Sequence, residues 1–297
     1  MFARTLDCNG RPLTLDRTRV VGVLNITPDS FSDGGRFVDH DAALEHALAM
    51  VEAGADMIDV GGESTRPGAA EVGPDEELQR VVPLIERLAA ASDVAIGIDT
   101  SKPDVMRAAV GAGAGLINDV YALRREGALE TAAALGVPVC VMHMQGQPRD
   151  MQAAPAYDDV VGEVHRFLAE RVFACQMAGI DVNQVLVDPG FGFGKTLEHN
   201  LELLRQLERF DNLGGGLYVG LSRKSMIGAL TGRETPGERG AGSVAAALIA
   251  AQRGAHLVRV HDVAPTRDAL AVWQAVHQGD RPAVSPTPAP PRWPDDD

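Results

Sequence analysis

Eight short apolar segments run along this chain, most of them end in a polar or glycine-bearing cluster, and helical patterns lie between them. Strict alternation of strand and helix predicts parallel strands joined by right-handed crossovers. When eight such units close into a barrel, the carboxyl ends of all the strands meet on one face. The segments expected as strands are residues 20–26, 56–60, 94–99, 116–118, 138–143, 184–188, 217–221 and 257–260. We therefore predict an α/β fold, a (β/α)8 TIM barrel, with its functional site on that face.

The alternative is a doubly wound open sheet, which also alternates strands and helices. A length of 297 residues suits one barrel of typical size, about 250 residues, or two smaller domains. The number of units and the lack of a GxGxxG motif after the first strand favour the barrel. Hydrophobic residues make up 45% of the chain and aromatic residues 4%, so the core must be aliphatic, as in parallel sheets buried on both faces.

The two ends of the chain differ from the alternating region. Residues 1–19 predict a short β-hairpin with Asn9-Gly10 as its turn, which could close the bottom of a barrel. Residues 280–297 are rich in proline and end in three aspartates, a composition typical of disorder. We expect one barrel domain over 1–279 and a disordered tail over 280–297.

Charge and cysteine content exclude several classes of function. A net charge of -14 argues against nucleic-acid partners, although it leaves room for a local basic pocket. The three cysteines are scattered, so neither a disulfide framework nor a zinc site is expected. There is no basic region followed by an apolar run at the start, and no apolar stretch long enough to span a bilayer. These features predict a cytoplasmic protein without a membrane partner.

One group of candidate residues is suited to an anion. Arg259 and His261 stand two apart at the end of the last strand, so alternation points them the same way and they could clamp an anion. Thr65 and Arg66, after the second strand, could add a hydroxyl and a second cation. The alternative is that Arg259 pairs with Asp262 or with a helix carboxylate.

Asn25 ends the first strand, beside this clamp in the predicted barrel. Its amide oxygen suits Mg²⁺, which takes few protein ligands and keeps several waters, although a lone asparagine can equally serve as a turn or cap. The loops 27–37 and 61–73 are polar and contain glycine, which suggests mobile lids. The alternative for both loops is an ordinary strand-to-helix connection.

A second group of candidate residues could read a flat heterocycle. Two carboxylates, an amide and an ammonium can meet the N–H groups, carbonyl and ring nitrogens of an aminopyrimidinone. The alternative is an internal salt-bridge network, such as a pair between Asp188 and Lys224. The glycine-rich segment 188–195 lacks the spacing of a phosphate loop and predicts a tight turn that places Phe193 over the mouth of the site. The four residues of the group are Asp99, Asn118, Asp188 and Lys224.

With these motifs in place, the chain resembles the dihydropteroate synthase family of pterin-binding enzymes. The resemblance extends over about residues 20–275 and rests on segments 24–35, 62–68, 117–120, 142–146, 188–195, 222–225 and 259–262. It implies a transferase of folate biosynthesis that condenses 6-hydroxymethyl-7,8-dihydropterin diphosphate with 4-aminobenzoate and releases diphosphate in an SN1-like displacement. It also implies Mg²⁺ as cofactor, inhibition by sulfonamides and a homodimer.

The resemblance also implies a role for each candidate residue. The pterin would be bound by Asp99, Asn118, Asp188 and Lys224. The diphosphate would be bound by Thr65, Arg66, Arg259, His261 and, through Mg²⁺, Asn25. The aminobenzoate site would be formed by Phe31, Thr65, Pro67, Phe193, Lys224 and Ser225. Asp99, Lys224, Arg259 and His261 would carry the catalytic role.

Two other functions fit part of the pattern. A methyltetrahydrofolate–corrinoid methyltransferase would share the barrel and the pterin site, but it needs neither a diphosphate clamp nor an aminobenzoate site. A catalytically inactive pterin-binding paralogue should have lost loop or clamp residues. The presence of Asn25, Thr65-Arg66 and the segments 222–225 and 259–261 argues against both.

Overall fold

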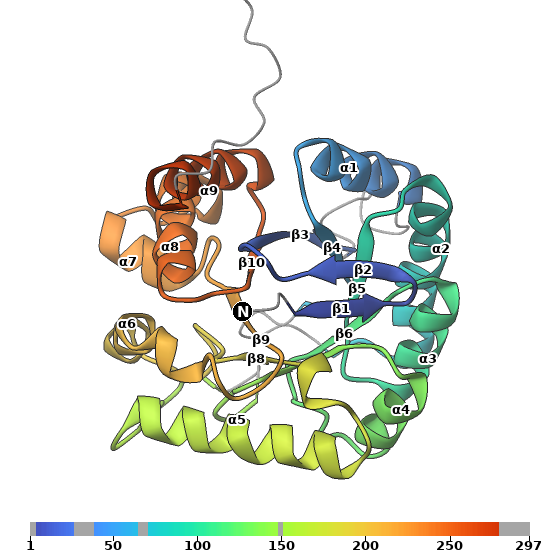
Figure 1. The fold of residues 1–297 in the computed structure, drawn as a ribbon, viewed down its shortest axis with the longest axis horizontal. Helices are drawn as coiled ribbons and strands as arrows, with labels where there is room; N and C mark the ends of the chain where they lie inside the picture. The colour runs from blue at the N-terminus through green and yellow to red at the C-terminus, as the bar shows by residue number, and fades with distance from the viewer. Residues whose placement is uncertain (1–3, 27–38, 65–70, 148–150, 279–297) are drawn as a thin grey trace, which may run out of the picture.

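The computed structural model describes residues 4–26, 39–64, 71–147 and 151–278. Eight parallel strands form a closed barrel in the order β10-β3-β4-β5-β6-β7-β8-β9, and helices surround it (Figure 1). The strands are β3 Arg19–Asn25, β4 Met57–Gly61, β5 Ala95–Asp99, β6 Leu116–Asp119, β7 Val139–Met142, β8 Val185–Asp188, β9 Gly216–Gly220 and β10 Leu257–Val260. The predicted (β/α)8 barrel is therefore confirmed.

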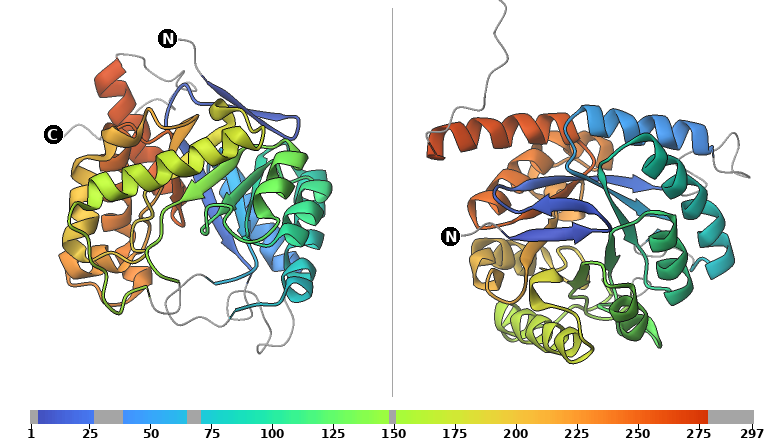
Figure 2. Two further views of the ribbon diagram at one scale, coloured as in Figure 1. Left: turned by 90° about the horizontal axis from the view of Figure 1, so that it is seen from below. Right: turned by 45° about the vertical axis from the view of Figure 1, so that its right-hand side comes forward.

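Helices follow the strands along the chain and cover the outside of the barrel (Figures 1 and 2). Asp39 caps the first helix by accepting from the backbone N–H groups of Asp41 and Ala42, as expected for an aspartate at this position. The helices are α1 His40–Glu52, α2 Pro74–Ala91, α3 Pro103–Ala112, α4 Ala128–Leu135, α5 Val160–Met177, α6 Leu197–Arg205, α7 Ser225–Thr231, α8 Gly240–Gln252 and α9 Val263–Gln278. Within the described residues, three short 3-10 helices accompany them, at Val182–Gln184, Leu207–Phe210 and Pro236–Arg239.

Alternation along each strand separates an outer core from an inner one. On β6, Ile117 belongs to the large cluster shared with the helices, whereas Leu116 belongs to a second cluster inside the barrel. This inner cluster takes one residue from every barrel strand, at the level where the strands begin: Val21, Met57, Ala95, Leu116, Cys140, Leu186, Tyr218 and Leu257. Two residues further along, four of the eight strands carry a polar residue at the inward position, and this change sets the depth of the site: Asp59, Asn118, Asp188 and Arg259.

An N-terminal hairpin closes the bottom of the barrel, as predicted. β1 (Thr5–Cys8) and β2 (Arg11–Thr14) pair antiparallel around Asn9 and Gly10, whose φ angles of 56° and 79° suit a tight hairpin turn. Figures 1 and 2 show the hairpin lying across one end of the barrel, and its buried side chains join the inner cluster. A Cβ on Gly115 would lie 2.2 Å from the carbonyl carbon of Cys8, so the hairpin packs against the backbone itself.

All three cysteines, Cys8, Cys140 and Cys175, are buried and free, as expected. No helix in the described part of the chain is both long and apolar enough to cross a membrane. The predicted disordered tail, residues 280–297, lies outside the described residues. The domain boundary at 279 therefore stays a prediction. The loops expected to act as lids also fall largely outside them, at 27–38 and 65–70.

Candidate active site

Polar side chains fill the barrel interior from the next inward-facing position after the apolar inner cluster, which forms the floor of the site. Asp59 on β4, Asn118 on β6 and Arg259 on β10 each stand two residues after a member of the inner cluster. Alternation therefore turns all three side chains into the barrel. Asp99, the last residue of β5, lies one inward position higher. Four polar side chains from four strands thus meet where the sequence predicted a site.

Arg259 joins two of the carboxylates. Its Nε donates to Oδ2 of Asp59 at 2.6 Å, and its Nη2 donates to Oδ2 of Asp99 at 2.9 Å. The alternative partner considered from the sequence, Asp262, pairs instead with Arg223 at 2.6 Å. The reason is depth, because Arg259 points into the barrel whereas Asp262 lies beyond the strand end. The guanidinium therefore neutralises the buried carboxylate of Asp59 and the partly buried one of Asp99.

Asp59 is the centre of this cluster, although the sequence did not single it out. Its side chain is completely buried, and its Oδ2 accepts from Arg259, from Nδ2 of Asn118 at 3.0 Å and from the hydroxyl of Tyr218 at 3.3 Å. Asp59 was missed because it lies inside a strand rather than at its end. The signal that could have found it is a carboxylate at an inward position of β4.

Burial raises the pKa of Asp99 to about 7. The charge of Arg259 opposes this rise, while the nearby carboxylates, Asp59 first among them, add to it. The pKa of Asp99 therefore lies near physiological pH, so a small change in pH decides whether its carboxylate accepts hydrogen bonds or is protonated.

Asp188 and Lys224 occupy the neighbouring sector. Asp188 is buried, and its Oδ1 accepts from the backbone N–H of Gly190 at 2.7 Å. Burial raises the pKa of Asp188 and lowers that of Lys224 to about 8, and each charge opposes the shift of the other. Lys224 Nζ donates to the carbonyl of Phe191 and lies 4.4 Å from the centre of the Phe193 ring. Among the described residues, the direct ion pair considered between Asp188 and Lys224 is not formed.

The glycine-rich segment after β8 folds into a tight turn, as predicted, around a lysine that the sequence did not single out. Lys195 is buried, with its Nζ 2.9 Å from the carbonyl of Gly190, 3.0 Å from that of Phe193 and 3.3 Å from that of His143. Nδ1 of His143 lies 3.0 Å away, and burial together with the charge of Lys195 lowers the pKa of His143 to about 2. This lysine fixes the turn that carries Phe193.

His261 and Ser222 link the ends of β10 and β9. The hydroxyl of Ser222 lies 3.0 Å from Nδ1 of His261 and accepts from the backbone N–H of the same residue at 3.2 Å. Ser225, the first residue of α7, is exposed on the same side of the barrel. Arg259 and His261 thus occupy different depths rather than one level.

Ion pairs and a hydrogen bond fix the start of the second loop, residues 61–73. Lys102 is buried and pairs with both Glu63 and Glu77, while Nη1 of Arg80 donates to the carbonyl of Gly62 at 2.7 Å. These contacts fix residues 61–64, from which the loop departs. Its expected site residues Thr65, Arg66 and Pro67, and Phe31 of the first loop, lie outside the described residues.

Asn25 ends β3 next to Gly61 of β4. A Cβ on Gly61 would stand 3.4 Å from Oδ1 of Asn25 and 3.5 Å from Cβ of Asp99, so the glycine leaves space between these two side chains. No group of three or more histidine, cysteine or carboxylate side chains suited to a metal occurs in the part of the chain that the structure describes. A single amide oxygen fits a cation such as Mg²⁺, which takes its other ligands from water and substrate oxygens.

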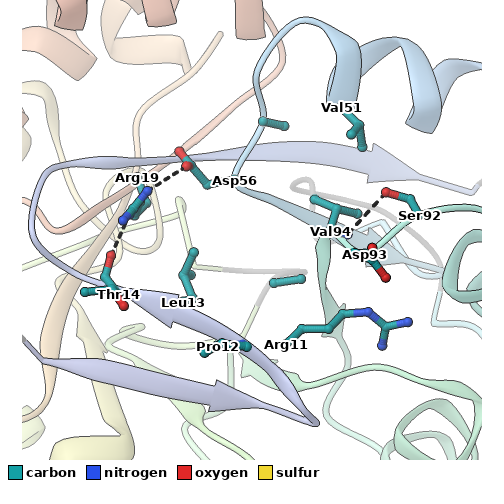
Figure 3. A pocket seen from close by; sticks show the side chains of 12 residues that line it. Arg11, Pro12, Leu13, Thr14, Arg19, Val51, Asp56, Ser92, Asp93 and Val94 are labelled. Atoms are coloured by element: carbon teal, nitrogen blue, oxygen red, sulfur yellow. Dashed lines mark hydrogen bonds and ion pairs between the residues drawn. The ribbon is translucent and has the colours of Figure 1, made fainter. Parts of the chain in front are cut away.

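A cavity of about 500 Å³ opens at the opposite end of the barrel (Figure 3). It lies between β2 and the beginnings of β3 and β5, where Arg19 reaches both Asp56 and the carbonyl of Thr14. In a (β/α)8 barrel, residues at the amino ends of the strands contribute to stability, whereas the active site lies at the carboxyl ends. The cavity is therefore separate from the polar strand ends.

Comparison with known proteins agrees with this geometry. A family model described as pterin binding enzyme matches residues 21–261. The dihydropteroate synthase of Escherichia coli K12 is 53% identical over 270 residues, which cover 91% of this chain and 95% of the relative. The chain belongs to the dihydropteroate synthase family.

Solved dihydropteroate synthases share the fold. That of Xanthomonas albilineans, determined with 4-aminobenzoic acid, has a TM-score of 0.88 and 61% identity and covers 93% of this chain and 98% of its own. The same protein was also solved with 7,8-dihydropteroate, at a TM-score of 0.84. A Yersinia pestis dihydropteroate synthase in a sulfonamide complex has a TM-score of 0.88 and 51% identity and covers 92% of this chain and 99% of its own. The family predicted from the sequence is confirmed, and with it the transferase class of the enzyme.

Proposed function

We propose that the polar strand ends of this barrel bind a dihydropterin diphosphate and join it to 4-aminobenzoate. The observation that carries the proposal is the cluster of Asp59, Asp99, Asn118 and Arg259 beside Asp188 and Lys224. It offers acceptors and donors at fixed positions above an apolar floor. This is what recognition of a flat heterocycle with both N–H and carbonyl groups requires.

The pterin would lie across this cluster. Asp188 would accept from two N–H groups of the aminopyrimidinone, and Asp99 from a further ring N–H. Asn118 would meet the pterin with its oxygen, because its Nδ2 is already engaged by Asp59. Lys224 would donate to the carbonyl and ring nitrogen. The support is that three of these residues stand at or next to the ends of β5, β6 and β8, while Lys224 follows β9, so all four lie on the same face of the barrel.

In the reaction, the bond between the pterin methylene carbon and the diphosphate oxygen breaks first, and its electron pair leaves with diphosphate. The amine of 4-aminobenzoate then forms the new C–N bond and releases a proton to solvent. Such a dissociative step depends on stabilising the departing anion. Arg259, His261, Thr65 and Arg66 would supply this stabilisation, and Asn25 would hold a Mg²⁺ that neutralises diphosphate charge.

The second substrate would sit nearer the mouth. Phe193 is held over Lys224, and Ser225 starts the following helix, so ring and carboxylate of 4-aminobenzoate would find an aromatic face and polar groups there. Phe31, Thr65 and Pro67 would complete this site from the loops. Sulfonamides, which mimic 4-aminobenzoate, would compete for the same place.

The first experiment is to incubate the purified protein with 6-hydroxymethyl-7,8-dihydropterin diphosphate, 4-aminobenzoate and Mg²⁺ and to follow dihydropteroate and diphosphate. We expect turnover that is lost on removing Mg²⁺ with EDTA and falls by about 10²–10³-fold in Lys224→Ala. Pterin binding without turnover would favour the inactive paralogue, and activity only with a corrinoid partner would favour the methyltransferase.

The pH dependence of kcat/KM for the pterin substrate should be bell-shaped. Below about pH 7 Asp99 becomes protonated and can no longer accept from the pterin, and above about pH 8 Lys224 loses its proton. Lys224→Arg should move the alkaline limb upward, because a guanidinium stays charged. An alkaline limb that is identical in the parent and in Lys224→Arg would refute the assignment to Lys224.

We also propose a cytoplasmic homodimer built from a single barrel domain over 1–279. Support for the dimer comes from exposed apolar side chains on the adjacent helices α7, α8 and α9, namely Leu230, Ile249, Val272 and Val276. These helices lie together on one side of the barrel (Figure 1). Sedimentation analysis of the full chain would measure the mass directly.

A further inference from the structure

Asp59 forms hydrogen bonds with three side chains at the base of the proposed pterin site, those of Asn118, Tyr218 and Arg259. It stands on β4, and its three donors stand on β6, β9 and β10. All three bonds converge on the same oxygen, Oδ2. The contacts therefore fix the relative positions of side chains from strands on different sides of the barrel.

The chemistry of a carboxylate dictates how Asn118 is oriented. A carboxylate only accepts hydrogen bonds, so the amide must present its NH₂ group to Asp59. The amide oxygen of Asn118 is then turned away from Asp59. Asp59 thus determines whether position 118 offers the pterin an acceptor or a donor.

The same carboxylate determines how Arg259 is held. Asp59 takes Nε at 2.6 Å while Asp99 takes Nη2 at 2.9 Å, so two edges of the planar guanidinium are fixed. Two points of attachment define the plane of the group. The remaining nitrogen, Nη1, is consequently aimed in one direction.

The cost of burying Asp59 argues that its role is more than structural. Buried ion pairs seldom stabilise a fold better than apolar residues of similar size. Its Oδ1 is buried without a hydrogen-bond partner among the described residues. A Cβ on Gly97 of β5 would lie 2.5 Å from this Oδ1, so only a glycine at this position leaves room for the carboxylate.

We propose that Asp59 is a positioning residue for the reaction, which orients the amide of Asn118 and the guanidinium of Arg259 for the pterin substrate. The inference rests on the proposed function, since it takes the floor of the barrel as the pterin site. Asp59 acts through these two side chains and does not itself contact substrate.

Asp59→Leu tests the proposal with little change in side-chain shape. Leucine offers no acceptor, so Nδ2 of Asn118 and Nε of Arg259 lose the partner that fixes their orientation. We expect the affinity for the bare 6-hydroxymethyl-7,8-dihydropterin, measured by calorimetry, to fall by about 10- to 100-fold, while KM for 4-aminobenzoate stays unchanged. Gly97→Ala should lower the same affinity by displacing the carboxylate without altering its charge.

The conservative variant Asp59→Asn separates orientation from general damage. Its amide oxygen can take the place of Oδ2 and accept from the same three donors, while its NH₂ group takes the place of Oδ1, which has no hydrogen-bond partner among the described residues. We expect Asp59→Asn to bind the pterin more tightly than Asp59→Leu, because the amide of Asn118 and the guanidinium of Arg259 keep an acceptor.

Asp56→Asn is the matched control. Asp56 directly precedes the same strand, β4, and it pairs with Arg19 at 3.0 Å and accepts from the backbone N–H of Val20 at 2.8 Å. This variant should lower the melting temperature but leave pterin affinity and KM values unchanged. Parent-like pterin affinity in both Asp59→Leu and Gly97→Ala, or an affinity in Asp59→Asn no better than in Asp59→Leu, would overturn the inference. A parent protein that binds no dihydropterin would instead refute the proposed function.

Discussion

Arg259→Ala should lower turnover by about 10³-fold and should also weaken the fold. The first effect follows if Arg259 stabilises departing diphosphate. The second follows from the geometry, because removal of the guanidinium leaves Asp59 and Asp99 close together at the floor without a counter-charge. Breaking a buried pair in this way typically costs about 3–5 kcal/mol of unfolding free energy. Steady-state kinetics and urea denaturation measure the two effects separately.

Arg259→Lys distinguishes the two roles of the residue. A lysine keeps a positive charge for the carboxylates but lacks the planar fork that can hold them and diphosphate together. We therefore expect this variant to regain much of the stability and the affinity for the bare pterin, while turnover of the diphosphate substrate stays low. If pterin affinity and turnover fall equally in Arg259→Lys, the diphosphate role is wrong and Arg259 serves the pterin site alone.

The fold could be predicted from the sequence because the signal is repeated in every unit. The last strand matches its predicted bounds, 257–260, and the other strands differ by one residue at one or both ends. Each unit carries its own apolar strand and its own helix, so local patterns suffice. The hairpin turn at Asn9-Gly10 was equally local, since both residues tolerate positive φ.

The site could be predicted only at the level of strand ends. Alternation indicates that Asp59, Asn118 and Arg259 point inward, but it does not say which carboxylate the guanidinium will reach. That choice depends on barrel closure, which brings together residues 200 positions apart. Proximity in sequence suggested Asp262 instead, and this partner belongs to Arg223. Contacts across the barrel are therefore the part that local patterns leave open.

Lys195 illustrates the same limit. A lysine after a glycine-rich turn would ordinarily be expected in solvent. It is buried here because the turn folds back over it, with positive φ angles at Gly190, Gly192 and Gly194. Only the folded turn brings its carbonyl groups within reach of one ammonium group. The chemistry of the residue is thus a product of the backbone around it.

Lys195→Met should consequently disrupt the turn. Methionine fills a similar volume but donates no hydrogen bond, so the carbonyls of His143 and Phe193 lose their partner, whereas that of Gly190 keeps the backbone N–H of Phe193. With about 1–3 kcal/mol for each buried group left unsatisfied, we expect the unfolding free energy to fall by about 2 kcal/mol or more.

The kinetic result should identify which substrate the turn serves. Because the turn holds Phe193 over Lys224, we expect Lys195→Met to raise KM for 4-aminobenzoate more than KM for the pterin substrate. Arg205→Met is the control, since Arg205 lies exposed on the next helix and should change stability by less than about 0.5 kcal/mol. If Lys195→Met keeps parent stability and an unchanged KM for 4-aminobenzoate, the turn does not depend on its buried lysine, and Phe193 must be positioned by its apolar neighbours Val120, Met142, Met144 and Met151.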